Sequence, residues 1–141
     1  MKIDAIKNGI VIDHIECGKG MEVYNFLNLD QLDCPVALIK NAYSKKTGNK
    51  DIIKIDEAID LNLDVLGYIA PTATVNIIKD SQIVEKKQLA LPQILKNVIK
   101  CKNPRCITSV EQEIEHQFRL VDEEKRIYRC VYCESKANDA M

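Results

Sequence analysis

The fold of the last third of this chain is decided by two stretches, Cys101-Lys102-Asn103-Pro104-Arg105-Cys106 and Cys130-Val131-Tyr132-Cys133. Each stretch places two thiols a few residues apart near a turn, so each can form a knuckle that presents two sulfurs to one point. Four converging thiolates suit a tetrahedral zinc ion. Because the protein supplies every ligand, no position remains for water or substrate. We therefore expect one structural Zn²⁺ per chain, held by Cys101, Cys106, Cys130 and Cys133.

A disulfide framework is the alternative for a chain of 141 residues with six cysteines. No N-terminal signal peptide is recognisable, since Lys2, Asp4 and Lys7 interrupt a strand-like pattern, and no apolar run is long enough to span a membrane. These features predict a cytoplasmic protein, in which thiols stay reduced and clustered cysteines more often bind metal. Cys17 and Cys34 stand apart from the cluster, and we expect ordinary buried thiols there.

Composition divides the chain into two parts. Lys and Arg total 20 against 21 Asp and Glu, so the charge balance gives no general attraction to nucleic acid or to a membrane. Residues up to Leu91 are rich in Ile, Val and Leu, whereas cysteines dominate from about Cys101. We predict two domains, residues 1–92 and residues 97–141. A segment of about 40 residues rarely holds a core unaided, so the second domain should need its metal to fold.

Strand and helix patterns alternate in the first domain. Residues 3–5 and 10–12 indicate two strands separated by a turn or bulge at Asn8-Gly9. A helix follows Gly20, because the apolar residues there spread over one broad side. Residues 36–39 and 51–55 then indicate a hairpin whose polar tip, residues 44–50, we expect to be flexible.

A second, short helix is expected from about Asp60, with Leu63, Leu66 and Ile69 or their neighbours turned inward. Residues 73–78 and 82–87 form a last hairpin. The order strand, helix, two strands, helix, strand predicts an α+β protein. We expect a ferredoxin-like α/β sandwich, with an antiparallel-rich sheet and two helices, followed by a small zinc-ribbon-like β domain.

Apolar and polar residues alternate from Val110 to Leu120 in the second domain, which predicts a strand. Residues 122–125 indicate a polar turn and residues 126–131 a returning strand, so the metal would clamp a small antiparallel meander. His116 lies on the apolar phase of the first of these strands. Since four thiolates already complete a tetrahedron, we expect a packed or partly exposed histidine and not a ligand.

The sequence contains no familiar catalytic motif: GxSxG, a Walker loop, GxGxxG and HExxH are all missing. Asp13 and His14 are adjacent, but neighbours on a strand point to opposite faces, so we expect no relay between them. The sequence predicts a binding or regulatory module and not an enzyme.

Two lysines, Lys54 and Lys86, occur in strand patterns that are otherwise rich in apolar residues. Such a cation is commonly a residue of a solvent face or sheet edge. Two ammonium groups and an imidazole near a strand edge can also receive the phosphates of a nucleotide. The spacing alone leaves both interpretations open.

Several segments, taken together and in order, resemble the regulatory chain of aspartate carbamoyltransferase. They are AIKNGIVIDHI at 5–15, KDIIKI at 50–55, YIAPTATVN at 68–76, and the run from Leu91-Pro92 through Asn97-Val98 into the cysteines. The resemblance implies a non-catalytic subunit with an N-terminal domain for nucleotide effectors and a C-terminal zinc domain that docks on the catalytic chain. Homodimers of this chain would bridge two catalytic trimers and control the first committed step of pyrimidine biosynthesis.

The resemblance also implies a nucleotide site. Asp13 and His14 would lie near the ribose and phosphates, with Lys54 and Lys86 as cationic partners. The other implied positions frame the base or surround the pocket: Ile3, Asp4, Ala5, Ile6, Val11, Lys50, Asn76, Ile78 and Ile83. Inhibition by CTP opposed by ATP is implied, with UTP as a further effector. Ser81 stands where the best-known relative has an aromatic residue at the base, so effector preference is open.

Contacts with the catalytic chain would map to Asn103, Arg105 and Glu134, beside the metal ligands. Arg105 replaces an expected amide and adds a charge there. The alternative class is a zinc-ribbon adaptor for nucleic acid. It is disfavoured because the region from Glu111 to Glu134 is rich in acidic residues, whereas nucleic acid requires a basic face. A closed set of four thiolates likewise disfavours a metalloenzyme.

Overall fold

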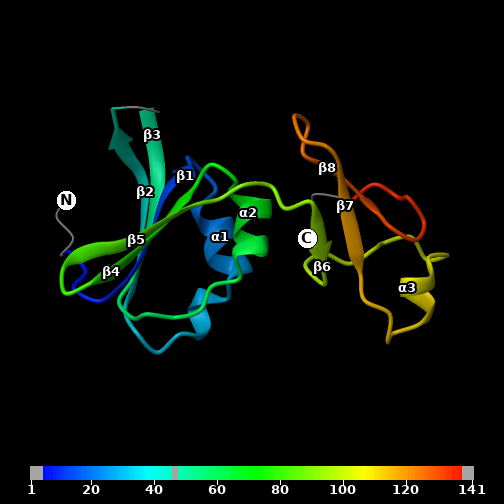
Figure 1. Cartoon of the computed structure of the whole chain (residues 1–141), viewed down its shortest axis with the longest axis horizontal. Helices are drawn as coiled ribbons and strands as arrows, with labels where there is room; N and C mark the ends of the chain where they lie inside the picture. The colour runs from blue at the N-terminus through cyan, green and yellow to red at the C-terminus, as the bar shows by residue number, and fades with distance from the viewer. Residues whose placement is uncertain (1–4, 46–47, 138–141) are drawn as a thin grey trace. The chain divides into compact units, whose positions relative to one another are not determined.

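The computed structural model describes residues 5–45 and 48–137, and the chain divides into two compact units, Met1–Ala90 and Leu91–Met141 (Figure 1). Each unit has buried apolar side chains of its own. Within the described residues, no helix has the length and apolar character needed to cross a membrane.

An antiparallel sheet of five strands forms the first unit, in the order β2-β3-β1-β4-β5. The strands are β1 Gly9–Glu16, β2 Val36–Ser44, β3 Gly48–Ile55, β4 Thr74–Lys79 and β5 Gln82–Gln88. The helices α1 Gly20–Phe26 and α2 Leu63–Ile69 lie on the same side of this sheet, and a 3₁₀ turn, Leu29–Gln31, follows α1 (Figure 1). The ferredoxin-like prediction is confirmed, with β5 added at one edge.

Alternation along the strands gives the sheet two different faces. Ile12, Ile53 and Val75 are buried in one cluster with Val23 of α1 and Leu66 of α2. Because side chains alternate along a strand, the residues between these buried positions point away from the helices. We call this second side the open face, and it comprises the outward positions of β1, β3, β4 and β5.

The first helix begins at a buried carboxylate from β3. Its own N-cap residue, Lys19, makes no capping hydrogen bond with its side chain. Asp51, which is fully buried, instead accepts hydrogen bonds from the backbone N–H groups of Gly18 at 3.1 Å, Gly20 at 2.8 Å and Asn41 at 3.0 Å. A negative charge is favourable at a helix N-terminus. Asp51 thereby joins α1 to the hairpin of β2 and β3.

Of the strand predicted over residues 3–5, only Ala5 belongs to the described residues, and Ala5 is not in a strand. Residues 5–8 form no strand, and Ile3 lies outside the described residues. The segment is held by the β4–β5 turn, because Ser81 N donates to Lys7 O at 2.9 Å and Asp80 N donates to Asn8 Oδ1 at 3.2 Å. Hydrogen bonds to a turn remote in the sequence leave no periodic signal in the segment itself.

Two further boundaries differ from the prediction. The hairpin of β2 and β3 is longer, because the strands continue into the polar run as far as Ser44 and from Gly48. In α2, Leu66 and Ile69 are buried as expected, but Leu63 in the first turn is 37% exposed. The N-cap Asn62 sets this start, since its Oδ1 accepts hydrogen bonds from the backbone of the first turn.

A three-stranded antiparallel sheet forms the second unit, in the order β6-β7-β8. The elements are β6 Ile94–Lys96, α3 Ile107–Val110, β7 Gln117–Asp122 and β8 Ile127–Cys130. Leu95, Ile99, Phe118 and Tyr128 supply its buried apolar side chains other than cysteine. The prediction that a small cysteine-rich β domain follows the first domain is confirmed.

The elements of the second unit differ in extent from the prediction. The strand expected over 110–120 begins only at Gln117, since α3 ends at Val110 and residues 111–116 are irregular. Val110 is 65% exposed, so the alternation of apolar residues and glutamates there did not reflect burial. The three-residue strand β6 gave no periodic signal. Strand β6 pairs with β7 of the second unit, although its residues precede residue 97, at which we predicted the second domain to begin.

Replacing Gly9 with alanine should destabilise the first unit. A Cβ at Gly9 would lie 2.1 Å from the backbone oxygen of Ile55, which is a strand atom that cannot rotate away. We expect a loss toward the upper end of the about 1–3 kcal/mol that overpacking costs. Thermal unfolding of Gly9→Ala measures it, with Lys7→Ala at an exposed position as the control. Equal melting temperatures for the two variants would contradict the prediction.

Candidate functional site

The cysteine cluster of the second unit has the geometry of a metal site. The sulfurs of Cys101, Cys106, Cys130 and Cys133 all lie within 4.8 Å of one another. Cys101 Sγ is 3.6 Å from Cys133 Sγ, and Cys106 Sγ is 3.7 Å from Cys130 Sγ. Four sulfurs at the usual zinc distance of about 2.3 Å, placed at the corners of a tetrahedron, would be separated by about 3.8 Å. The four residues therefore fit a tetrahedral metal ion.

The thiols differ in how readily they ionise. Burial raises the pKa of Cys101 to about 12, and it also raises the pKa of Cys130. Cys133 is different, because hydrogen bonding by Ser135 lowers its pKa to about 6. Buried thiolates without a cation would be costly, so a bound cation is the natural counter-charge for this cluster.

The two knuckles are joined by Asn103, one of the residues predicted to contact the catalytic chain. Its Nδ2 donates to Ser135 Oγ at 3.3 Å, and its Oδ1 accepts from Arg105 N at 3.0 Å. The Arg105 side chain is exposed. Glu134 is exposed too and forms an ion pair with Arg119, whose guanidinium holds the pKa of Glu134 below its usual range. Asn103 thus has a structural role within the unit, while Arg105 and Glu134 are at the surface.

On the open face of the first unit, four predicted ligand residues lie in one row. Val11 of β1 pairs with Lys54 of β3 on one side and with Asn76 of β4 on the other, and Asn76 pairs with Lys86 of β5. Asn76 is 8% exposed, and its Oδ1 is buried with no hydrogen-bond partner among the residues that the structure describes. Buried polar atoms are normally satisfied. The row therefore combines two cations with an acceptor that lacks a donor.

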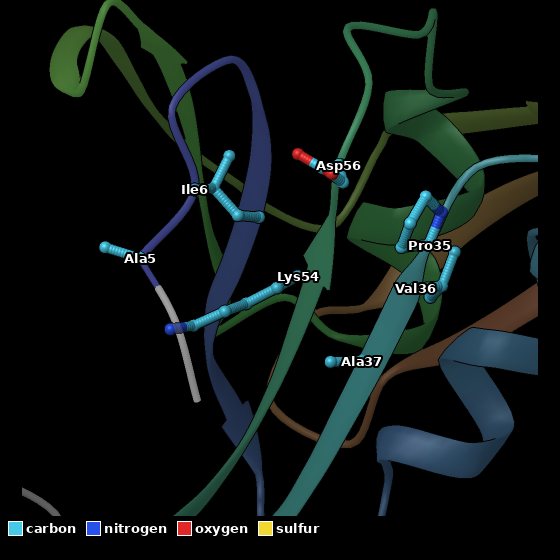
Figure 2. Close-up of a pocket in the computed structure, with 7 residues that line it drawn as sticks. All are labelled: Ala5, Ile6, Pro35, Val36, Ala37, Lys54 and Asp56. Carbon is cyan, nitrogen blue, oxygen red and sulfur yellow. The ribbon is translucent and has the colours of Figure 1, made fainter. Parts of the chain in front are cut away.

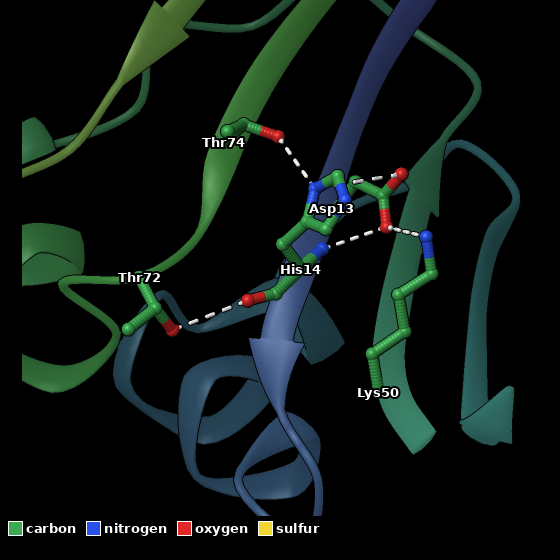
Figure 3. A network of polar contacts seen from close by, with 5 residues as sticks. All are labelled: Asp13, His14, Lys50, Thr72 and Thr74. Carbon is green, nitrogen blue, oxygen red and sulfur yellow. Dashed lines mark hydrogen bonds and ion pairs between the residues drawn. The ribbon is translucent and has the colours of Figure 1, made fainter. Parts of the chain in front are cut away.

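Asp13 and His14 lie together on a β-bulge, and the prediction that they point to opposite faces is wrong (Figure 3). The register of β1 against β3 shifts between Ile12 and Ile15, and His14 has a φ of 57°. His14 Nδ1 is consequently only 3.9 Å from Asp13 Oδ2, and His14 N donates to Asp13 Oδ1. An inserted residue breaks the two-residue alternation on which the prediction rested.

Other polar groups hold this bulge in place. Lys50 Nζ is 2.8 Å from Asp13 Oδ1, and Thr74 Oγ1 is 3.3 Å from His14 Nδ1 (Figure 3). Thr72 Oγ1 donates to His14 O at 3.3 Å. The threonines were missed from the sequence, although Thr74 shares the face of Asn76 by its spacing of two residues.

Substituting Lys50 with methionine should raise the pKa of Asp13. Burial acts to raise that pKa, but hydrogen bonds from Lys50 and from the backbone of His14, with the positive charges, outweigh it and lower it overall. In the native chain the resulting stabilisation is complete above about pH 5 and is lost as pH falls through the lowered pKa. Carboxyl-carbon NMR of Asp13 against pH should show a higher midpoint in Lys50→Met. An unchanged midpoint would contradict the ion pair.

A pocket of about 280 Å³ adjoins Lys54 (Figure 2). Ala5 and Ile6 stand on one side of it, and the lysine side chain extends toward them from β3. The remaining lining residues, which sequence reasoning missed, are Pro35, Val36, Ala37 and Asp56. The pocket offers mainly apolar walls with one cation and one carboxylate.

The remaining predicted positions are placed as follows. Ile78 of β4 pairs with Gly9 and with Ile83 of β5 on the open face. Ile3 and Asp4 lie outside the described residues. Cys17 is exposed and donates to Asn41 Oδ1 at 2.8 Å, so the expectation of a buried thiol is wrong there, and Cys34 is only partly buried.

These features define a class of protein, a two-unit chain with a polar face on an α+β unit and four converging cysteines, suited to a metal ion, on a β unit. A family model of the allosteric domain of aspartate carbamoyltransferase regulatory chains matches residues 1–90, and a model of their metal binding domain matches residues 93–140. The chain belongs to the family of aspartate carbamoyltransferase regulatory chains.

Regulatory chains of three bacteria illustrate the similarity. The chain of Clostridium acetobutylicum is 57% identical over 134 residues, which is 95% of this chain and 92% of that one. The chain of Clostridium botulinum is 53% identical over the same shares, and that of Bifidobacterium longum is 47% identical over 97% of this chain and 99% of its own. The prediction of a regulatory, non-catalytic chain with an allosteric and a metal-binding domain is confirmed.

Proposed function

We propose that the open face binds nucleotide effectors, CTP and ATP in competition and UTP as a further effector, and that one Zn²⁺ holds the second unit in shape. Through these two sites the chain would control aspartate carbamoyltransferase in the cytoplasm. The observation that carries the proposal is the row of Lys54, Val11, Asn76 and Lys86 across four strands.

The chemistry of the open face supports a nucleotide as its ligand. Adjacent strands are about 4.8 Å apart, so the backbones of Lys54 and Lys86 are separated by about 14 Å, and both flexible side chains can converge on one ligand between them. Lys50, His14 and Asp13 form a polar cluster farther along the same two strands, β1 and β3. Ile78, Ile83 and the pocket at Ala5 and Ile6 offer apolar surface for a base.

The unpaired Asn76 Oδ1 supports the same assignment. A base or sugar has N–H or O–H groups that can donate a hydrogen bond to this oxygen. Such a bond would remove the free-energy cost of a buried unsatisfied acceptor. Lys54 and Lys86 would supply positive charge to phosphates on either side of it. The mechanism at this site is binding alone, with no bond made or broken.

Zinc is proposed because four thiolates with sulfurs at tetrahedral spacing are typical of structural zinc sites. The ion would supply charge neutralisation and a cross-link between the knuckles. Asn103, Arg105 and Glu134 would then be presented to the catalytic chain. Homodimers of this chain would bridge two catalytic trimers, and an effector would bias the assembly by its differential affinity for two quaternary states, typically about 1–3 kcal/mol. No nucleic acid or membrane is required as a partner.

Mixing the purified chain with catalytic trimers, with and without zinc, tests this function. We expect a complex only with zinc, with CTP and ATP shifting the response to aspartate in opposite directions. Light scattering measures the assembly, and initial rates measure the response. Failure to form a complex in the presence of zinc would contradict the assembly role. A complex whose rates ignore nucleotides would contradict the regulatory role.

A further inference from the structure

We propose that His116 is a positioning residue of the metal centre: its imidazole Nδ1 holds the backbone of Cys101, and so fixes the first knuckle to the strand that also anchors the second. This inference rests on the zinc site of the proposed function and extends it to a residue outside the four ligands. His116 directly precedes β7 and is partly buried.

The contact that suggests this role is a hydrogen bond to the main chain of a metal ligand. Cys101 N donates to His116 Nδ1 at 3.1 Å. A backbone N–H can only donate, so Nδ1 must offer its lone pair, and the ring proton of the neutral imidazole must be on Nε2. Nδ1 is therefore occupied, and the metal-type cluster found among the described residues consists of four cysteines without this histidine.

The backbone of His116 is itself fixed at two points. Asn97 N donates to His116 O at 2.7 Å, and His116 N donates to Asn97 Oδ1 at 3.0 Å. Asn97 has a φ of 57°, so the chain turns there at the end of β6. The segment from Asn97 to Cys101 is thus hydrogen-bonded to His116 at both ends. Asn97 contacts the His116 backbone, and Cys101 contacts the imidazole.

The next residue connects the same place to the second knuckle. Gln117 O accepts from Val131 N at 3.0 Å, and Phe118 pairs with Cys130 across β7 and β8. Residues 116–118 consequently connect Cys101 of the first knuckle with Cys130 and Val131 of the second. Without the imidazole acceptor, the N–H of Cys101 would lose this hydrogen bond to the segment that precedes β7.

Groups that orient metal ligands typically change metal affinity by 10- to 100-fold when they are removed, and this is the effect expected here. The useful pair of variants is His116→Asn and His116→Leu. In asparagine Oδ1 is bonded to Cγ, as Nδ1 is in histidine, so an acceptor stays at the same distance along the side chain. Leucine has a similar volume but places a methyl group at that position. The two differ chiefly in the hydrogen-bond acceptor.

The experiment is chelator competition for Zn²⁺ on the full-length chain, with Co²⁺ absorption as a report on the four-thiolate tetrahedron. We expect His116→Asn to bind zinc within about threefold of the native chain and His116→Leu to bind about 10- to 100-fold more weakly. The Co²⁺ spectrum of His116→Leu should keep its thiolate bands at saturating metal. Glu113→Leu, at an exposed position of the same loop, is the control and should leave affinity unchanged.

Several outcomes would overturn the inference. Native affinity in His116→Leu would show that the acceptor is not needed, and equal losses in the asparagine and leucine variants would show that ring packing matters instead. If His116→Leu does not fold even with saturating zinc, His116→Gln replaces it. Its oxygen lies one carbon too far to reproduce Nδ1, so affinity equal to that of His116→Asn overturns the inference. Absence of zinc binding by the native chain would overturn the metal site itself.

Discussion

Removing the metal is expected to unfold the second unit and to leave the first unit folded. Among the described residues of the second unit, the buried apolar side chains besides the cysteines are those of Leu95, Ile99, Phe118 and Tyr128, and the sheet has three short strands. So small a core needs a cross-link, and the binding energy of a structural zinc ion, about 10–16 kcal/mol in small zinc domains, acts as folding energy. Amide NMR with a strong chelator should show collapse of the signals of the second unit alone.

Cysteine variants provide the matched control for this result. Cys106→Ser removes a ligand whose sulfur is 3.7 Å from that of Cys130, and it should reproduce the effect of the chelator. Cys34→Ser removes a thiol of the first unit that stands apart from the cluster and should leave the second unit folded. A second unit that keeps its signals after metal removal would contradict the prediction, as would simultaneous loss of both units.

The second large effect is expected at the open face. Replacing Lys54 or Lys86 with methionine should weaken binding of CTP and ATP by about 10- to 100-fold each, because hydrogen bonds to charged groups contribute about 1.5–3 kcal/mol. Methionine keeps much of the side-chain length without the charge. Calorimetric titration of the full-length chain at physiological salt gives the dissociation constants, and the double variant shows whether both lysines contact one ligand, since their effects would then not be additive.

Lys87 is the matched control for charge. It follows Lys86 on β5, so its side chain points to the opposite side of the strand. Lys87 Nζ is 3.6 Å from Glu85 Oε1. Lys87→Met removes the same charge from the same strand, so we expect little change in nucleotide affinity. An equal loss in Lys86→Met and Lys87→Met would indicate a general electrostatic effect and would argue against a site at the row.

The open face also shows why part of the site lay beyond sequence reasoning. Asp13 and His14 share a bulge that depends on how β1 pairs with residues about 40 positions away on β3. Thr74 reaches His14 across 60 positions. In the second unit the alternation of glutamates with other residues over 111–116 predicted a strand that does not form. Alternation along the chain does not show which residues are buried.

The sequence by itself determined the chemistry of the cysteine cluster, the division into an aliphatic and a cysteine-rich part, and the order of strands and helices in the first unit from Gly9 onward. Ligand type, composition and periodicity are local properties, and local properties can be read from neighbouring residues. Only the tertiary structure decided that Lys54, Val11, Asn76 and Lys86 form one row, that Asp51 caps α1 and that His116 reaches Cys101. Each of these depends on strand register or on contacts between segments remote in sequence, and those are set by packing of the whole unit.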